Sequence, residues 1–103
     1  RNHLGVDIVA KSKEVIKTIQ NGTVVFSGWT SKGGHTIIIQ HSNNFISVYK
    51  HNAVLLKKTG TFVSAGGAVA LVGNTGELTS GPHLHFELWK NGLAVNPCNY
   101  LNF

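Results

Sequence analysis

The most constraining feature of the sequence is the regular interruption of short hydrophobic runs by turn signals. Runs such as residues 36–40 (TIIIQ) and 45–50 (FISVYK) are rich in β-branched and aromatic residues, and the turn sequence 42–44 (SNN) separates them. No stretch of ten residues has the hydrophobic period of an amphipathic helix. Many short strands at regular spacing predict an all-β protein, either a sandwich or a barrel.

The expected strands are bounded by Gly, Asn, Ser or Pro. They comprise residues 4–10, 14–20, 23–27, 36–40, 45–50, 53–56, 61–63, 68–72, 83–89 and 93–95. The dipeptide Asn21-Gly22 lies between two of these segments, and Asn-Gly favours a two-residue hairpin turn. We therefore expect residues 14–20 to pair with residues 23–27.

The size and composition fit one globular domain, residues 1–103, and we expect it to be a monomer. Cys98 is the single cysteine, which excludes an intrachain disulfide and a Cys-based zinc site. No apolar run approaches the roughly 20 residues that a membrane helix needs. Because Arg1 is preceded by neither Met nor a signal-like segment, we expect an upstream segment, including any targeting signal, to be missing.

The charge balance allows two interpretations. Nine basic residues against four acidic ones give a net charge of +5, which is typical of a mildly basic solvated surface and also suits anionic partners such as nucleic acid, acidic polymers, or membrane and cell-wall surfaces. The lysines are scattered, and there is no Arg-rich stripe interleaved with aromatic residues. We therefore expect no nucleic-acid partner.

Histidines and carboxylates gather near the two ends of the chain. His3 and Asp7 are four residues apart, and His83, His85 and Glu87 alternate along a predicted strand. Because side chains alternate across a strand, each group lies on one face. A solvent-facing polar row on an ordinary amphipathic strand would give the same pattern. Two of the four acidic residues nevertheless lie in these histidine-containing strands.

Imidazole nitrogens and carboxylate oxygens are ligands of zinc, and a catalytic zinc site uses three protein ligands and leaves one position for water. Two histidines and one aspartate, brought together from opposite ends of the chain, would fit that description. The pattern therefore favours a catalytic metal site over a polar strand surface.

The motifs HLGVDIVA, YKH, GNTG and GPHLHFEL, followed by NG and NP, resemble those of the lysostaphin-type zinc metallopeptidases. These are peptidoglycan endopeptidases of bacterial cell envelopes, and the resemblance covers almost the whole chain. It implies the duplicated hybrid motif fold, a compact antiparallel β-sandwich or barrel-sandwich hybrid with a substrate groove. It also implies a location in the bacterial envelope or outside the cell, periplasmic or extracellular.

The resemblance assigns roles to matching positions. His3, Asp7 and His85 resemble the ligands of one Zn²⁺ ion, and His83 and His51 resemble a pair of catalytic histidines. The implied reaction is hydrolysis of peptide stems or cross-bridges of peptidoglycan by a metal-activated water, with histidine acting as general acid and base. The resemblance leaves open which of His51 and His83 is the base, and which bond is cut.

Several neighbouring residues have two readings each. Glu87 either orients a ligand imidazole by accepting a hydrogen bond from it or is a strand-surface carboxylate. His41 is structural or lines the groove, and Asn74 borders the groove or serves as a turn residue. We expect His35 to be a surface histidine and Trp89 to lie in the core or at a rim.

Two other functions compete with the enzyme. Relatives that activate wall hydrolases without cleaving peptidoglycan usually lack some of the metal ligands. In this sequence all five positions, for three metal ligands and two catalytic histidines, carry the matching residue types. The segment 60–73 (GTFVSAGGAVALVG) also resembles half-barrels of biotinyl, lipoyl and sugar-phosphotransferase carriers. A biotinyl or lipoyl carrier needs a modifiable lysine at a hairpin tip, and the corresponding turn 73–76 (GNTG) has none.

Overall fold

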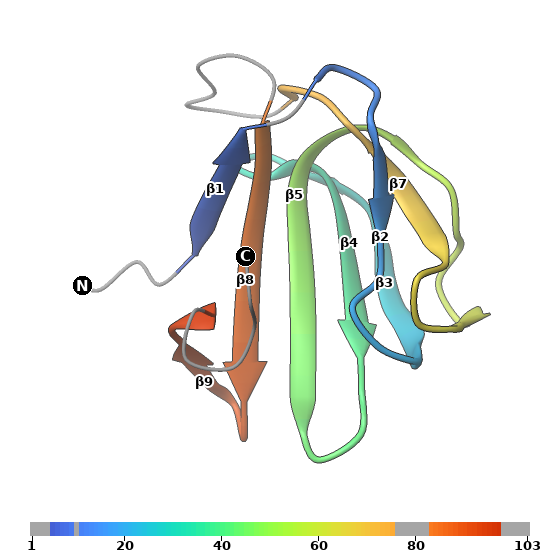
Figure 1. Cartoon of the computed structure of the whole chain (residues 1–103), viewed down its shortest axis with the longest axis vertical. Helices are drawn as coiled ribbons and strands as arrows, with labels where there is room; N and C mark the ends of the chain where they lie inside the picture. The colour runs from blue at the N-terminus through green and yellow to red at the C-terminus, as the bar shows by residue number, and fades with distance from the viewer. Residues whose placement is uncertain (1–4, 10, 76–82, 98–103) are drawn as a thin grey trace.

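The computed structural model describes residues 5–9, 11–75 and 83–97 (Figure 1). Within these ranges the chain forms antiparallel strands, which confirms the all-β prediction, and none of the described residues forms a helix that could cross a membrane. The strands are β1 (Val6–Val9), β2 (Val15–Lys17), β3 (Gly22–Thr30), β4 (Gly34–Gln40), β5 (Phe45–Leu55), β6 (Phe62–Val63), β7 (Ala68–Val72), β8 (His83–Lys90) and β9 (Leu93–Val95).

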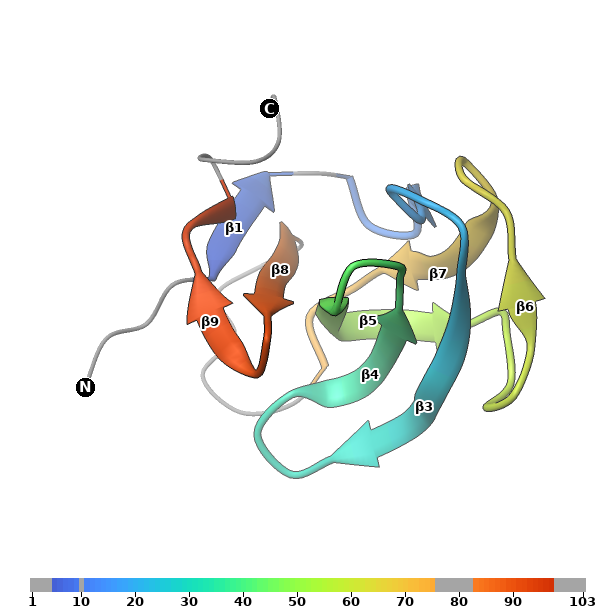
Figure 2. The same ribbon diagram turned by 90° about the horizontal axis from the view of Figure 1, so that it is seen from below.

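The strands form a bent, open sheet in the order β1-β8-β5-β4-β3-β6. Strand β9 pairs with the second half of β8, while β7 pairs with the second half of β5 and carries β2 on its other edge. Figures 1 and 2 show β5 near the centre, with β1 and β9 at one side and β7 at the other. This bend encloses one face of the sheet and leaves the other face accessible.

The core lies on the enclosed face. Ile37 and Ile39 of β4 are fully buried there, and Phe86 and Leu88 of β8 are each 2 % exposed. Ile38, between the two buried isoleucines, points to the opposite face and lines a groove. The remaining core is supplied largely by β2, β6 and β7, through Ile16, Val63, Val69, Ala70 and Val72. Alternation along β4 and β8 therefore separates core residues from groove residues.

Strand β5 is continuous, although the sequence predicted two strands, 45–50 and 53–56. Its register against β4 shifts between the pairs Ile37↔Tyr49 and His35↔Asn52, so two residues of β5 oppose one of β4. This bulge contains His51, whose φ is 62°. Before the bulge β5 pairs with β8, and after it β5 pairs with β7. A bulge changes the direction in which side chains point, and in β5 it lies where the pairing changes from β8 to β7.

The hairpin predicted at Asn21-Gly22 is wrong. Strand β2 pairs with β7, and β3 pairs with β4 and β6. A Cβ atom on Gly22 would lie 2.5 Å from the carbonyl oxygen of Gln40, so this glycine permits close approach of two backbones. The Asn21 side chain accepts a 2.7 Å hydrogen bond from the backbone N–H of Ala65. The dipeptide thus serves long-range packing, and an Asn-Gly pattern does not distinguish this use from a tight turn.

We expect Gly22→Ala to lower the free energy of unfolding by about 1–3 kcal/mol, because the new methyl group collides with backbone that cannot rotate away. Chemical denaturation measures this change. Val25→Thr on the same strand is the control, since Val25 is 47 % exposed and its replacement should change stability by less than about 0.5 kcal/mol. Equal stability of the two variants would contradict the close approach.

Candidate functional site

Strand pairing at one side of the sheet brings two of the predicted ligand residues together. Asp7 of β1 lies opposite His85 of β8 in the register, and Asp7 Oδ1 is 2.8 Å from His85 Nδ1. His85 is 6 % exposed, whereas the Asp7 side chain is 57 % exposed. The contact therefore joins a buried imidazole to a carboxylate that faces solvent, across 78 positions of sequence.

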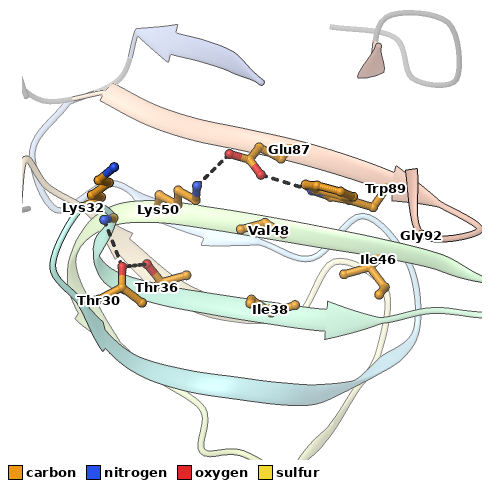
Figure 3. A pocket seen from close by; sticks show the side chains of 11 residues that line it. Thr30, Lys32, Thr36, Ile38, Ile46, Val48, Lys50, Glu87, Trp89 and Gly92 are labelled. Atoms are coloured by element: carbon orange, nitrogen blue, oxygen red, sulfur yellow. Dashed lines mark hydrogen bonds and ion pairs between the residues drawn. The ribbon is translucent and has the colours of Figure 1, made fainter. Parts of the chain in front are cut away.

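Glu87 contacts the other side of the same imidazole. Its Oε2 atom lies 2.9 Å from His85 Nε2 and 2.8 Å from Lys50 Nζ, while its Oε1 atom accepts a 3.1 Å hydrogen bond from Trp89 Nε1. Figure 3 shows the contacts of Glu87 with Lys50 and Trp89. The hydrogen bond with His85, supported by Lys50 and Trp89, outweighs burial and holds the pKa of Glu87 far below its ordinary value. Glu87 is therefore a carboxylate with both oxygens engaged.

The imidazole of His85 is held between two carboxylates. Burial alone would lower its pKa, but the hydrogen bonds with Glu87 and Asp7 outweigh burial and raise the pKa above the ordinary value. A cation taking the place of the Nδ1 proton would meet one imidazole nitrogen and one carboxylate oxygen, which are donors that zinc accepts. The donor chemistry of this pair therefore fits a zinc ion.

A glycine makes room for this imidazole. A Cβ atom on Gly5 would lie 2.6 Å from both Nε2 and Cε1 of His85, and 3.1 Å from Cγ of Glu87. The backbone of the HLGVD motif therefore lies directly against the His85 ring. This packing explains a glycine two residues before Asp7, a position at which no turn requires it.

His51 approaches the same place from the bulge in β5. Its ring centroid is 5.8 Å from that of His85, and its Nδ1 atom lies 2.6 Å from the carbonyl oxygen of Thr75. A carbonyl oxygen only accepts, so Nδ1 carries the proton and donates it, which leaves the lone pair on Nε2. The left-handed backbone of His51 is further held by its N–H, which donates to Gly33 O at 2.6 Å. The imidazole thus has a fixed tautomer and a fixed direction.

Thr75 positions His51 through several contacts. Its hydroxyl donates to the carbonyl oxygen of Asn52 at 2.5 Å and accepts from the N–H of His35 at 3.1 Å. Thr75 therefore links the loop after β7 to the bulge in β5 and to His35 of β4. Asn74 is exposed and directly precedes Thr75.

The remaining predicted residues lie in different parts of the chain. His3 lies outside the described residues, and His83 is described only by its backbone, which pairs with Val9. His41 lies at the opposite end of β4, is 5 % exposed, and contacts Asn21 O at 2.8 Å and Ser47 Oγ at 2.6 Å. These contacts favour the structural reading of His41 over the groove-lining one.

Sequence reasoning missed two contributors to the site. Lys50 precedes His51 in the YKH motif, and only the pairing of Lys50 with His85 across β5 and β8 places its ammonium group beside Glu87. Thr75 holds His51 through a main-chain carbonyl, for which residue type gives no signal. A search for basic residues next to the histidine of the YKH motif could have found Lys50 but not Thr75.

A groove of about 400 Å³ begins at Glu87 and runs along the accessible face of the sheet (Figure 3). Its floor is largely aliphatic, formed by Ile38 of β4 and by Ile46 and Val48 of β5, and Trp89 lies at one side. The other lining residues are Thr30, Lys32, Gly33, Thr36, Lys50 and Gly92. The predicted groove is therefore present, and Trp89 belongs to its rim.

The described part of the chain contains no group of three or more His, Cys, Asp or Glu side chains arranged to hold a metal ion. The described part of the predicted ligand set is thus the pair formed by Asp7 and His85.

Comparison with known proteins places these features in context. The sequence model of peptidase family M23 matches residues 1–97 of the chain. Murein hydrolase activator NlpD of Escherichia coli is 39 % identical over 98 residues, which are 94 % of this chain and 25 % of that protein. Peptidoglycan DD-endopeptidase ShyC of Vibrio cholerae is 39 % identical over 95 residues, 92 % of this chain and 22 % of that protein. The chain spans about a quarter of the length of the first curated relatives it matches.

Solved structures agree with the fold. The catalytic domain of lysostaphin, an antimicrobial peptidase of Staphylococcus simulans, matches with a TM-score of 0.87 and 30 % identity, covering 95 % of this chain and 77 % of that one. A zinc-containing peptidase from Vibrio cholerae matches with a TM-score of 0.87 and 31 % identity, covering 91 % of this chain and 29 % of that one.

We expect Gly5→Ala to displace the His85 ring, because the added methyl group would occupy the space of its Nε2 and Cε1 atoms. NMR signals of the histidine ring nitrogens would show the loss of the contacts with Asp7 and Glu87, while the His41 signals stay unchanged. Val25→Ala is the control, since Val25 is 47 % exposed and its strand β3 is separated from β8 by β4 and β5. Unshifted His85 signals in Gly5→Ala would contradict the packing.

Proposed function

Because this chain belongs to peptidase family M23, we propose that it is a zinc-dependent endopeptidase that hydrolyses peptide stems or cross-bridges of bacterial peptidoglycan. The observation that carries the proposal is the contact between Asp7 Oδ1 and His85 Nδ1, with Glu87 on the opposite ring nitrogen. A carboxylate that accepts from the second nitrogen of a ligand histidine is a common outer partner in zinc sites. The name of the relative ShyC supports the substrate class.

The proposed zinc ligands are His3, Asp7 and His85. When bound, zinc would polarise the scissile carbonyl and lower the pKa of water, which is the chemistry that peptide hydrolysis needs. The chain itself supplies the orientation of His85, which Glu87 fixes through Nε2.

His51 is proposed to move a proton. Its Nδ1 proton is donated to Thr75, so its Nε2 lone pair is available to accept a proton near His85. We propose His83 as the second catalytic histidine on the basis of the family motif GPHLHFEL alone. Variants of His51 and His83 distinguish how much each histidine contributes to proton transfer.

The groove beside Glu87 is the proposed peptide-binding surface. Its aliphatic floor suits peptide side chains, and the net charge of +5 suits an anionic wall polymer. We further propose that residues 1–103 act as one monomeric domain. Relatives named as lipoproteins, such as the NlpD/LppB homologue of Pseudomonas aeruginosa, support a location in the cell envelope.

A second candidate function is activation of a separate wall hydrolase without cleavage. The observation in its favour is the 39 % identity with a protein named as a murein hydrolase activator. The endopeptidase is favoured here because all five proposed metal and catalytic positions carry suitable residue types. The two functions differ in whether the purified chain itself releases peptides.

Digestion of isolated peptidoglycan sacculi decides between them. We expect the purified protein to release peptides, and a chelator to abolish their release, because the proposed reaction depends on zinc. Mass spectrometry of the new amino termini identifies the cleaved bond. A zinc-loaded protein that releases nothing alone, yet increases release by an added wall hydrolase, would establish the activator instead.

We expect Asp7→Ala and His85→Ala to lose zinc and activity together, since each removes a proposed ligand. Metal content after gel filtration and peptide release from sacculi measure both effects. His35→Ala is a matched control, because His35 packs against Trp29 at a centroid distance of 5.0 Å and is not a proposed ligand. Full zinc occupancy in either ligand variant would remove that residue from the ligand set.

We expect His51→Ala to retain zinc but to lose roughly 10²–10⁴-fold in turnover, the usual contribution of a positioned general acid or base. Zinc content and the rate of peptide release separate this effect from metal loss. The same measurements on His83→Ala show how much of the turnover depends on His83. If His51→Ala cleaves at the wild-type rate, the proton-transfer role belongs to His83 or elsewhere.

A further inference from the structure

The Glu87 carboxylate contacts three polar side chains at the site. It accepts from Lys50, His85 and Trp89, and its side chain is only 12 % exposed. Since Oε2 is shared by Lys50 and His85 while Oε1 is taken by Trp89, the plane of the carboxylate is fixed. A carboxylate held in this way can in turn fix the imidazole that donates to it.

Lys50 also balances charge at the site. Asp7 and Glu87 flank the same imidazole, and the Lys50 ammonium lies 2.8 Å from the more buried of these two carboxylates. Without Lys50, Oε2 of Glu87 would lose its cationic partner. The carboxylate would then be free to rotate away from His85 Nε2 or toward a nearby metal ion.

Trp89 has two functions that can be separated. Its ring lines the groove along with Ile46 and Val48, and its indole N–H donates to Glu87 (Figure 3). Residues 85, 87 and 89 alternate on one face of β8, so the groove rim and the proposed zinc ligand are linked along a single strand.

We propose that Lys50 and Trp89 are positioning residues that act through Glu87 to hold His85 in the orientation that binds zinc. This inference rests on the proposed zinc site but concerns residues outside the proposed ligand set. Removal of an outer partner of this kind typically weakens metal binding about 10–100-fold.

The test measures zinc affinity by competition with a chromophoric chelator, using the whole chain. We expect Glu87→Ala to weaken binding about 10–100-fold and Lys50→Met and Trp89→Phe about tenfold, because each removes one hydrogen bond from the carboxylate. Lys50→Met keeps the aliphatic stem, Trp89→Phe keeps the aromatic rim, and Lys50→Arg should restore most of the affinity. The controls Lys58→Met and Trp29→Phe should stay within about twofold of the wild type, since these side chains are exposed.

The double variant Lys50→Met/Glu87→Ala provides the sharpest result. If Lys50 acts through Glu87, the double variant binds zinc as weakly as Glu87→Ala alone, and the effects are not additive. The absorption spectrum of the Co²⁺-loaded protein should also change in Lys50→Met and Trp89→Phe. Wild-type zinc affinity in these two variants, or additive losses in the double variant, would overturn the inference.

These outcomes are distinct from failure of the proposed function. If wild-type protein digests sacculi and the positioning variants bind zinc normally, the inference alone is wrong. If zinc affinity follows the expected series but the wild type releases no peptide, the proposed reaction alone is wrong. Circular dichroism of the zinc-free variants identifies any that fail to fold, and Lys50→Met and Trp89→Phe test the inference independently of each other.

Discussion

The pairing of β1 with β8 is the interaction on which the candidate site depends. It places Asp7 opposite His85, and a slip of one residue would turn Asp7 to the other face of the sheet. Strand β8 can hold this register because its opposite edge pairs with β5 and its alternate side chains, Phe86 and Leu88, are buried in the core. The polar row of β8 is therefore positioned by the apolar row that shares the strand.

The bulge at His51 is the second determinant of the site. A regular strand would give successive residues of β5 opposite faces, yet Lys50 reaches Glu87 while His51 approaches His85. The extra residue and the positive φ of His51 make both contacts possible. Strain of this kind persists only where the surroundings enforce it, and the hydrogen bonds of His51 with Gly33 and Thr75 provide that enforcement.

Local patterns predicted much of the fold, and long-range geometry accounts for what they missed. The bounds of β7 and β9 and the two faces of β8 follow from alternation and flanking turns, which are properties of short segments. The hairpin at Asn21-Gly22 failed because the contact of Gly22 with Gln40 is set by a distant strand. Motif resemblance named Asp7, His51 and His85 as site residues, but the contacts of Lys50 and Thr75 depend on register and on a backbone carbonyl. Residue types alone do not encode such contacts.

The distance along the chain between Asp7 and His85 has a consequence for biosynthesis. The two residues are separated by 78 positions, and β8 is translated after β1 to β7. A nascent chain that ends short of His85 has Asp7 but neither His85 nor Glu87, whose carboxylate contacts the His85 imidazole. The pair cannot form until β8 has been translated, so any activity that depends on it arises only after β8 has emerged and paired with β1.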